Sequence, residues 1–418
     1  MMLNIAETTE ARADETAARG TPFHAATSGE MRTPWWFAWD KYIVPDVYTS
    51  MPRELAAIRN AVAMIDMSPI AKMEVRGPDA HELIDRLMTR DMRRLEVNQV
   101  MYTPWCNHDG LIVGDGLVFR LEADRFMISG GSSHAWFASH ADGLQVEIRS
   151  ASDDYGILSL QGPKSFDLLG AATGQDWSGL KFSQIGRAKV AGVDVFVARQ
   201  GFTGERGFEL WVPKNGGVAV WRHLQAAGQI FGVVCAGEYA VEVARIEAGL
   251  ILISSDYDAA DVDLATARVD AANDRHITPF EAGLGRLVNL DSDFVGRDAL
   301  KAAKASDEPR RCFVGLRYDA VELLRIAAEK SACGTALSRV FWGSMRAFKD
   351  GELVGRASSL AYSATQRQAI SFGFVPERLS SAGSTIEVEL TDDEGAVLDM
   401  VKATIVPLPF VEIKRSKG

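Results

Sequence analysis

The sequence predicts an α+β body followed by an all-β terminal domain. A chain of 418 residues is too long for one hydrophobic core, because single cores rarely grow beyond about 250–300 residues. Before residue 300, segments with apolar residues at helical spacing alternate with segments of two-residue alternation. After residue 310, short alternating runs are separated by Gly-rich turns. We therefore expect a flexible N-terminal arm over residues 1–33, a body of two interleaved domains over residues 34–306, and a terminal domain over residues 307–418.

The first part of the body predicts a helix, a strand and a second helix. The first helix is indicated by apolar residues at helical spacing, namely Leu55, Ile58, Val62 and Ile65. Residues 72–76 alternate polar and apolar, as a half-buried strand does. Gly77-Pro78-Asp79 then precedes a helical stripe that includes Leu83 and Leu87.

The segments after residue 100 also predict strands and a helix. Residues 102–129 predict strands separated by turns, and residues 193–212 predict two strands around Gly201-Phe202-Thr203-Gly204. A helical stripe of Tyr239, Val243, Ile246 and Leu250 follows. Residues 301–309 form a polar linker, and residues 386–406 predict a hairpin.

Composition excludes several classes of protein. A net charge of −11 and a pI near 5.3 argue against nucleic-acid binding, which needs clustered Lys and Arg. No apolar run approaches the roughly 18–20 residues that cross a bilayer. The four cysteines and seven histidines show no ligand spacing, so no metal site is expected. Acidic residues near the N-terminus, such as Glu7 and Asp14, do not fit a targeting peptide, and we expect a cytoplasmic protein.

Several short blocks, taken together, resemble the glycine-cleavage T-protein (aminomethyltransferase) superfamily. In order along the chain they cover residues 65–68, 77–80, 160–163, 201–209, 245–250, 279–285, 294–297 and 355–359. The resemblance implies a three-domain, cloverleaf-like fold with a C-terminal β-barrel-like domain. It also implies a central channel that binds tetrahydrofolate as cofactor. Because one fold hosts several reactions, the resemblance does not choose among them.

Four residues match positions that contact folate in this family. Glu205 matches a glutamate that accepts N–H groups of the pterin, and Phe202 matches a ring beside it. Arg245 matches an arginine that points into the folate site, and Tyr102 begins a strand that faces the channel. The alternatives are a surface acid on a turn for Glu205, a salt bridge to Glu242 for Arg245, and core packing for the two rings.

One departure from the family pattern bears on the reaction. Where aminomethyltransferases carry two successive aspartates, this chain has Gly114 followed by Asp115. Loss of the first carboxylate favours a demethylase-like branch. Asp115 is expected to bind the cofactor by orienting the pterin, or to act in catalysis by orienting a water; the alternative is an ordinary turn residue. The segment between residues 250 and 279 is longer than in aminomethyltransferases. It supplies Tyr257 and His276 as candidate catalytic residues that contact the leaving group, although polar loop residues are the simpler reading.

The sequence thus predicts a tetrahydrofolate-dependent methyltransferase that demethylates a small O-, S- or N-methylated substrate. Folate N5 would attack the methyl carbon in line, and most of the acceleration would come from alignment. One alternative is the aminomethyltransferase of glycine cleavage, which needs a lipoyl-carrier partner. Another is a folate-binding iron–sulfur assembly factor without turnover. An aromatic group, Trp35, Trp36, Phe37 and Trp39, would suit an aromatic ether or a methylated cation, but such groups also pack cores. The oligomeric state stays open.

Overall fold

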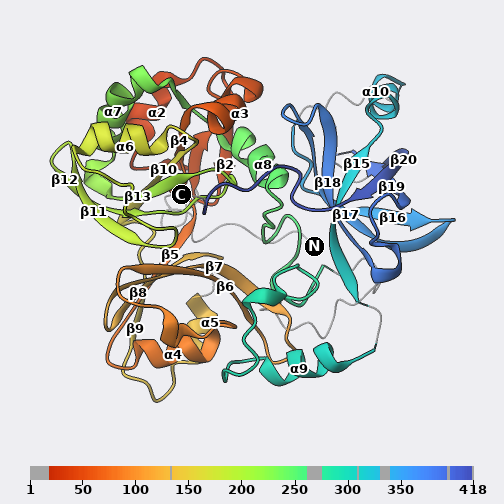
Figure 1. Cartoon of the computed structure of the whole chain (residues 1–418), viewed down its shortest axis with the longest axis horizontal. Coiled ribbons are helices and arrows are strands. Elements are labelled where there is room, and N and C mark those ends of the chain that lie inside the picture. Colours follow the sequence, from red (N-terminus) through yellow and green to blue (C-terminus); the bar gives the residue numbers. More distant parts are fainter. Residues whose placement is uncertain are drawn as a thin grey trace, which may run out of the picture.

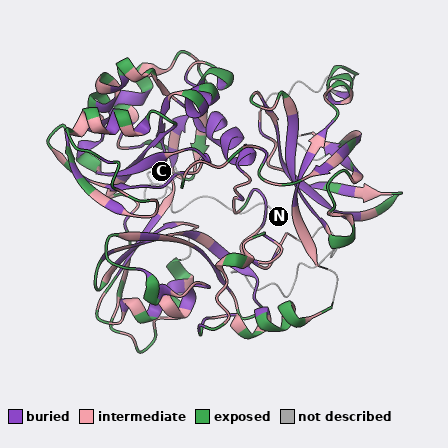
Figure 2. Ribbon diagram, viewed as in Figure 1, coloured by how far each residue is buried: buried purple, intermediate pink, exposed green. Residues whose placement is uncertain are grey.

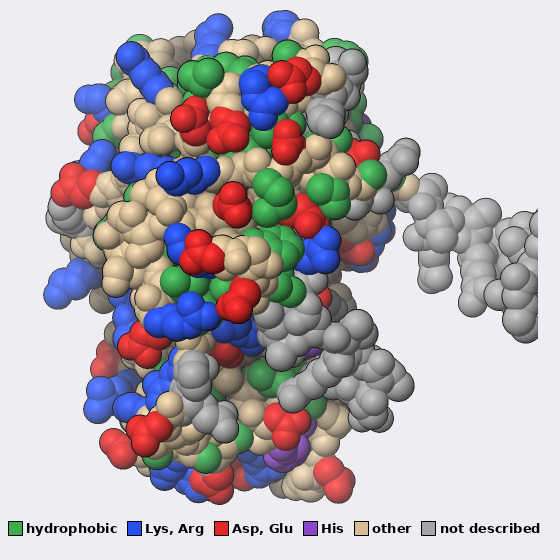
Figure 3. Space-filling model, turned by 90° about the vertical axis from the view of Figure 1, so that its right-hand side faces the viewer, with side chains coloured by type: hydrophobic (Ala, Val, Ile, Leu, Met, Phe, Trp, Pro, Cys, Tyr) green, Lys and Arg blue, Asp and Glu red, His purple; other side chains and the backbone are tan. Residues whose placement is uncertain are grey.

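Three lobes lie around a common centre (Figure 1). The computed structural model describes residues 18–131, 134–260, 275–307, 310–329, 339–392 and 396–416. Two lobes mix helices and strands, and the third is a closed barrel. This is the α+β, three-lobed arrangement that the sequence predicts. Acidic and basic side chains are interspersed on the face shown in Figure 3, in keeping with the absence of a basic stripe in the sequence.

The first lobe is built on a six-stranded sheet in the order β11-β12-β13-β10-β4-β14. Its strands are β4 (Val62–Asp66), β10 (Tyr155–Gln161), β11 (Ile185–Val190), β12 (Val193–Ala198), β13 (Gly207–Pro213) and β14 (Val233–Cys235). Helices α2 (His24–Glu30), α6 (Ser165–Thr173) and α7 (Gly217–Gly228) cover one face. There Phe208, Leu210 and Trp221 belong to one buried cluster. Alternate residues of β13 therefore point away from these helices.

The second lobe holds a five-stranded sheet in the order β6-β7-β8-β5-β9. Its strands are β5 (Ala71–Arg76), β6 (Gln99–Cys106), β7 (Ile112–Glu122), β8 (Arg125–Gly130) and β9 (Glu147–Ser150). Helices α4 (Ala80–Leu87) and α5 (His134–Ser139) pack on its outer face, where Leu83, Phe137 and Val118 share a cluster. The chain enters this lobe between β4 and β5 and leaves it between β9 and β10, so the two lobes interleave.

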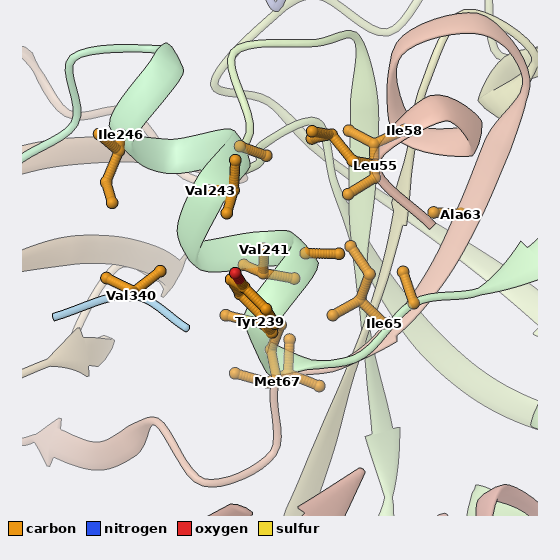
Figure 4. Packing of buried hydrophobic residues seen from close by; sticks show 14 of the residues in the cluster. Leu55, Ile58, Ala63, Ile65, Met67, Tyr239, Val241, Val243, Ile246 and Val340 are labelled. Atoms are coloured by element: carbon orange, nitrogen blue, oxygen red, sulfur yellow. The ribbon is translucent and has the colours of Figure 1, made fainter. Parts of the chain in front are cut away.

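The inner faces of the two sheets share a single core, which we call the inter-sheet core. It joins Val100, Phe119 and Leu121 of the second lobe to Ile157 and Trp211 of the first. Helices α3 (Met51–Asn60) and α8 (Glu238–Glu247) extend the same core, and Figure 4 shows their apolar side chains together. All ten residues of α8 are buried (Figure 2).

The third lobe is a barrel closed in the order β15-β18-β17-β16-β19-β20. Its strands are β15 (Arg311–Tyr318), β16 (Met345–Lys349), β17 (Glu352–Ser363), β18 (Gln368–Pro376), β19 (Thr385–Thr391) and β20 (Val397–Val406). The expected hairpin over residues 386–406 is confirmed as β19 and β20. Helix α9 (Arg297–Ala305) precedes the barrel. The terminal domain is not entirely β, because α10 (Ala320–Glu329) buries Leu323 and Ile326 in the barrel cluster.

Three further sequence expectations are wrong in detail. The polar linker expected over residues 301–309 is helical in its first part, because α9 continues to Ala305. The first predicted helix ends at Asn60, and Val62 and Ile65 lie in β4, all five residues of which are buried. A short, fully buried strand and a helix both give unbroken apolar runs, so spacing alone did not separate them. The expected arm over residues 1–33 is also too long. Within its described part, β1 (Arg19–Gly20) pairs with β3 (Tyr42–Pro45), and Phe23 is fully buried against the first lobe. Residues 1–17 lie outside the described residues.

The barrel is held to α8 by a buried ion-pair network around Arg245. Its guanidinium donates to Glu242 from Nε (3.2 Å) and Nη2 (2.8 Å), to Asp256 from Nη1 (2.7 Å), and to the Leu250 carbonyl (3.3 Å). Nη2 also donates to Ser359 of β17 at 2.8 Å. All five N–H donors of the arginine are therefore used within the chain.

We expect Arg245→Met to lower the free energy of unfolding by about 3–5 kcal/mol, because it leaves buried carboxylates without their partner. Urea unfolding followed by circular dichroism measures the effect. The control is Arg325→Met, which breaks the half-exposed pair with Glu329 and should cost less than about 1 kcal/mol. Equal losses in the two variants would contradict a stabilising role for the Arg245 network.

Candidate functional site

Two acidic residues face the inter-sheet core from opposite sheets. On β7, Asp115 is in phase with Leu117, Phe119 and Leu121, which pack in that core. On β13, Glu209 is in phase with Trp211. The rings of Phe119 and Trp211 are in contact, with centroids 4.7 Å apart. Because side chains alternate along a strand, both carboxyl groups point toward the region between the sheets.

Asp115 is held by two phenols from different parts of the chain. Tyr102 of β6 donates to its Oδ2 at 2.5 Å, and the Tyr257 hydroxyl donates to its Oδ1. Burial raises the pKa of Asp115, while the two phenol hydrogen bonds act in the opposite direction. The structure thus brings together three of the residues that the sequence singled out.

Gly114 lies on the other face of the same strand. A Cβ built there would come within 2.6 Å of the ring of Trp105, which is buried in the outer cluster of the second lobe with Phe137. A carboxylate at position 114 would point into that outer cluster. The glycine therefore does not remove an acid from the inter-sheet region, and the argument that it marks a demethylase loses its structural basis.

Glu209 is the acidic residue that the sequence reasoning missed. Its side chain is buried and has no hydrogen bond or ion pair in the part of the chain that the structure describes. Burial raises the pKa of Glu209 to about 7, since the charged form is poorly solvated. An aromatic and aliphatic pocket begins beside it, lined by Phe119, Tyr155, Phe196, Ala198 and Trp211 among others. Ala198 is the direct cross-strand neighbour of Glu209.

The signal for Glu209 was present in the sequence. The block over residues 201–209, which resembles the family, contains both Glu205 and Glu209, and its glycine turn lies beside Glu205. Strand alternation puts Glu209 opposite in direction to Phe208 and Leu210, which pack under the helices. A polar residue on the inner side of a buried strand needs a partner, and this is the criterion that would have selected it.

Glu205 is buried but lies in a different environment from the one expected. Its Oε1 lies 3.4 Å from Arg59 of α3 and 3.5 Å from Lys414 near the C-terminus, while Oε2 has no partner in the described chain. Two cations therefore lie beside one oxygen of this buried carboxylate, and its other oxygen keeps a free acceptor.

The other predicted residues divide between the site and the scaffold. Phe202 packs at the edge of the inter-sheet core, where a ring is available for stacking. Arg245 is expected to contact folate, with a salt bridge to Glu242 as the alternative. In the structure its N–H groups donate to Glu242, Asp256 and the other acceptors of the network described above. His276 lies beside Arg275, and its carbonyl oxygen accepts a hydrogen bond from Arg311 at 3.0 Å. No contact in the described chain joins His276 to Asp115.

The aromatic group near the N-terminus contributes to packing around a cation of the chain itself. Arg339 lies over the rings of Phe37 (4.6 Å) and Trp342 (4.4 Å) and pairs with Asp46. Within the aromatic group, the ring of Phe37 therefore already holds a cation of the chain itself. Within the described ranges, no cluster of His, Cys, Asp and Glu is arranged to hold a metal. No helix among them is both long and apolar enough to span a bilayer.

Comparison with known proteins identifies the family. The sequence model of the GCVT N-terminal domain matches residues 14–292, and that of the glycine cleavage T-protein C-terminal barrel domain matches residues 331–412. An aminomethyltransferase of Streptomyces coelicolor is 32% identical over 392 residues, covering 91% of this chain and 93% of that protein. One from Caldanaerobacter subterraneus subsp. tengcongensis is 30% identical, covering 83% and 86%.

A solved structure supports the fold. The glycine cleavage system aminomethyltransferase T from Bartonella henselae superposes with a TM-score of 0.77 at 22% identity, over 96% of this chain and all of that one. With both family domains matched in order over most of its length, the chain belongs to the glycine-cleavage T-protein superfamily, a family of tetrahydrofolate-dependent one-carbon transferases.

Proposed function

We propose that this protein moves a one-carbon unit from an aminomethyl group on a carrier to tetrahydrofolate. The observation that carries the proposal is the pair of interior carboxyl groups, Asp115 and Glu209, which face the same inter-sheet region from opposite sheets. The curated relatives reported above bear the name aminomethyltransferase. The main sequence argument for a demethylase, the glycine at position 114, concerns the outer face of β7 and so does not favour methyl transfer.

The residues present fit a reduced pterin. Its ring offers an edge of N–H donors, for which a carboxylate is a two-point acceptor. Glu209 is buried and has no ion pair or hydrogen bond among the residues that the structure describes, and a ligand that supplies N–H donors would offset the cost of that burial. Phe202 and Trp211 add apolar surface for a planar ring. We assign the pterin edge to Glu209 in place of Glu205, because Arg59 and Lys414 already neutralise Glu205.

Asp115 is the group best placed to handle protons. When bound, tetrahydrofolate supplies the nucleophilic nitrogens that take up the carbon. As the transferred carbon bonds to the folate nitrogens, it would give up its bond to nitrogen, which leaves as ammonia, and its bond to the lipoyl sulfur, which leaves as the thiol. The Asp115 carboxylate would accept a proton released from a folate nitrogen, and such general-base help contributes typically about 10²–10⁴-fold. Phenols on both of its oxygens fix the orientation of the carboxylate, so alignment costs little when the reactants arrive.

The activity is tested by incubating the full chain with tetrahydrofolate and an aminomethylated lipoyl carrier protein. We expect methylenetetrahydrofolate and ammonia in equal amounts, with loss of both in Asp115→Asn. A parallel arm supplies methylated aromatic acids, sulfonium compounds and betaines in place of the carrier. Formation of 5-methyltetrahydrofolate in that arm, without turnover of the carrier, would support the demethylase instead. Folate binding with no turnover of any donor would support a non-catalytic role.

The proposed role of Glu209 in binding the pterin is tested by measuring folate affinity. Glu209→Gln keeps the shape but removes the charge, and hydrogen bonds to charged groups are worth about 1.5–3 kcal/mol. We therefore expect the dissociation constant of 5-formyltetrahydrofolate to rise roughly 10- to 150-fold, as measured by calorimetry. The matched control, Glu205→Gln, should weaken binding less.

The same titration has a pH signature. Because the pKa of Glu209 is raised to about 7, the carboxylate that accepts pterin N–H groups is populated above that pH and lost below it. Affinity of the wild type should fall as the pH is lowered from 8 to 6, and this dependence should vanish in Glu209→Gln. An unchanged affinity in Glu209→Gln at pH 8 would remove Glu209 from the site.

A further inference from the structure

We propose that Tyr257 is a positioning residue for this reaction, which keeps Asp115 oriented and ionised and makes that state depend on the docking of the barrel. The inference rests on the proposed function, and it adds a residue that acts through Asp115 without touching the reacting atoms itself. Its support comes from three features: the environment of the Tyr257 ring, the anchoring of its backbone, and the charges around Asp115.

The ring of Tyr257 is fixed in an apolar setting. It is fully buried in a cluster with Ile112, Ile277 and Phe374, which come from three separate parts of the chain. A phenol hydroxyl in such a place has no water to bind, and leaving it without a partner would cost about 1–3 kcal/mol. Its hydrogen bond to Asp115 Oδ1 is therefore a contact that packing enforces.

The backbone at this position is anchored through the preceding residue. Asp256 accepts hydrogen bonds from Arg245 of α8 at 2.7 Å and from Ser358 and Ser359 of β17 at 2.7 and 2.5 Å. The Tyr257 carbonyl accepts the Ser254 N–H at 2.7 Å. The segment is thus tied to α8 and the barrel through Asp256, and to β7 of the second lobe through the Ala260 N–H, which donates to the Ile112 carbonyl at 2.9 Å. The contact thus joins all three lobes.

The charges facing Asp115 explain why the second phenol matters. Tyr102 comes from β6, Tyr257 from the anchored segment, and Asp256 lies close enough to disfavour a second negative charge. Arg286 and Arg415 lie close enough to Tyr102 for their charges to favour its ionised form. Burial raises the pKa of Asp115, and the phenol hydrogen bonds are the interactions that lower it again. Loss of either phenol therefore favours the protonated, unreactive acid.

The test replaces Tyr257 with Phe, which keeps the ring and removes one hydroxyl. We expect the acid limb of the kcat/KM profile to move up by about one to two pH units, as loss of a hydrogen bond to a charged group implies. Activity should largely recover at higher pH. The control is Tyr318→Phe, which removes another fully buried hydroxyl, bonded to Ser371 in the barrel at 2.8 Å, and should leave the limb in place.

A measurement without folate separates this inference from the proposed function. Proteins labelled with ¹³C at aspartate carboxyl groups are titrated by NMR, and the Asp115 signal is assigned by its loss in Asp115→Asn. Its titration should shift upward in Tyr257→Phe whether or not the protein transfers aminomethyl groups. Incorporation of 3-fluorotyrosine at position 257, a stronger donor of the same shape, should shift it downward. An unchanged Asp115 titration in both proteins would overturn the proposal.

Discussion

The structure depends on one buried ion-pair network, in which Arg245 joins α8 to Asp256 and to the barrel. Desolvating a guanidinium and two carboxylates is costly, and the cost is offset here because every donor of the arginine has an acceptor. This network fixes where the barrel sits and where the segment around Tyr257 runs. The position of Tyr257 in the site between the two sheets therefore depends on the Arg245 network, which lies outside that site.

Two carboxyl groups with different surroundings face that region, and their difference indicates a division of roles. Glu209 is buried and has no partner in the described part of the chain, so its charge is available to a ligand that brings donors. Asp115 already holds two phenols, so it is oriented before any ligand arrives. Pairs of titratable groups in contrasting environments are a common basis for assigning binding and proton transfer to separate residues.

The glycine at position 114 shows how a sequence departure can mislead. In the sequence alone it was the loss of one of two acids and argued for methyl transfer. In the structure, position 114 faces Trp105 and position 115 faces the inter-sheet core. Adjacent residues on a strand point to opposite sides of the sheet. A substitution therefore bears on the reaction only if its side chain points to the side that holds the site.

The sequence by itself determined the family, the α+β body, the terminal barrel and most elements, because motif blocks and apolar periodicity are local properties of the chain. It also named Tyr102, Asp115 and Tyr257, although nothing in the sequence said that they meet. Only the tertiary structure decided that all donors of Arg245 are used within the fold, and that Arg59 and Lys414 lie beside Glu205. It also decided that Glu209 has no ion pair or hydrogen bond among the described residues. Those outcomes depend on contacts between residues up to about two hundred positions apart in the chain, and local patterns carry no information about such partners.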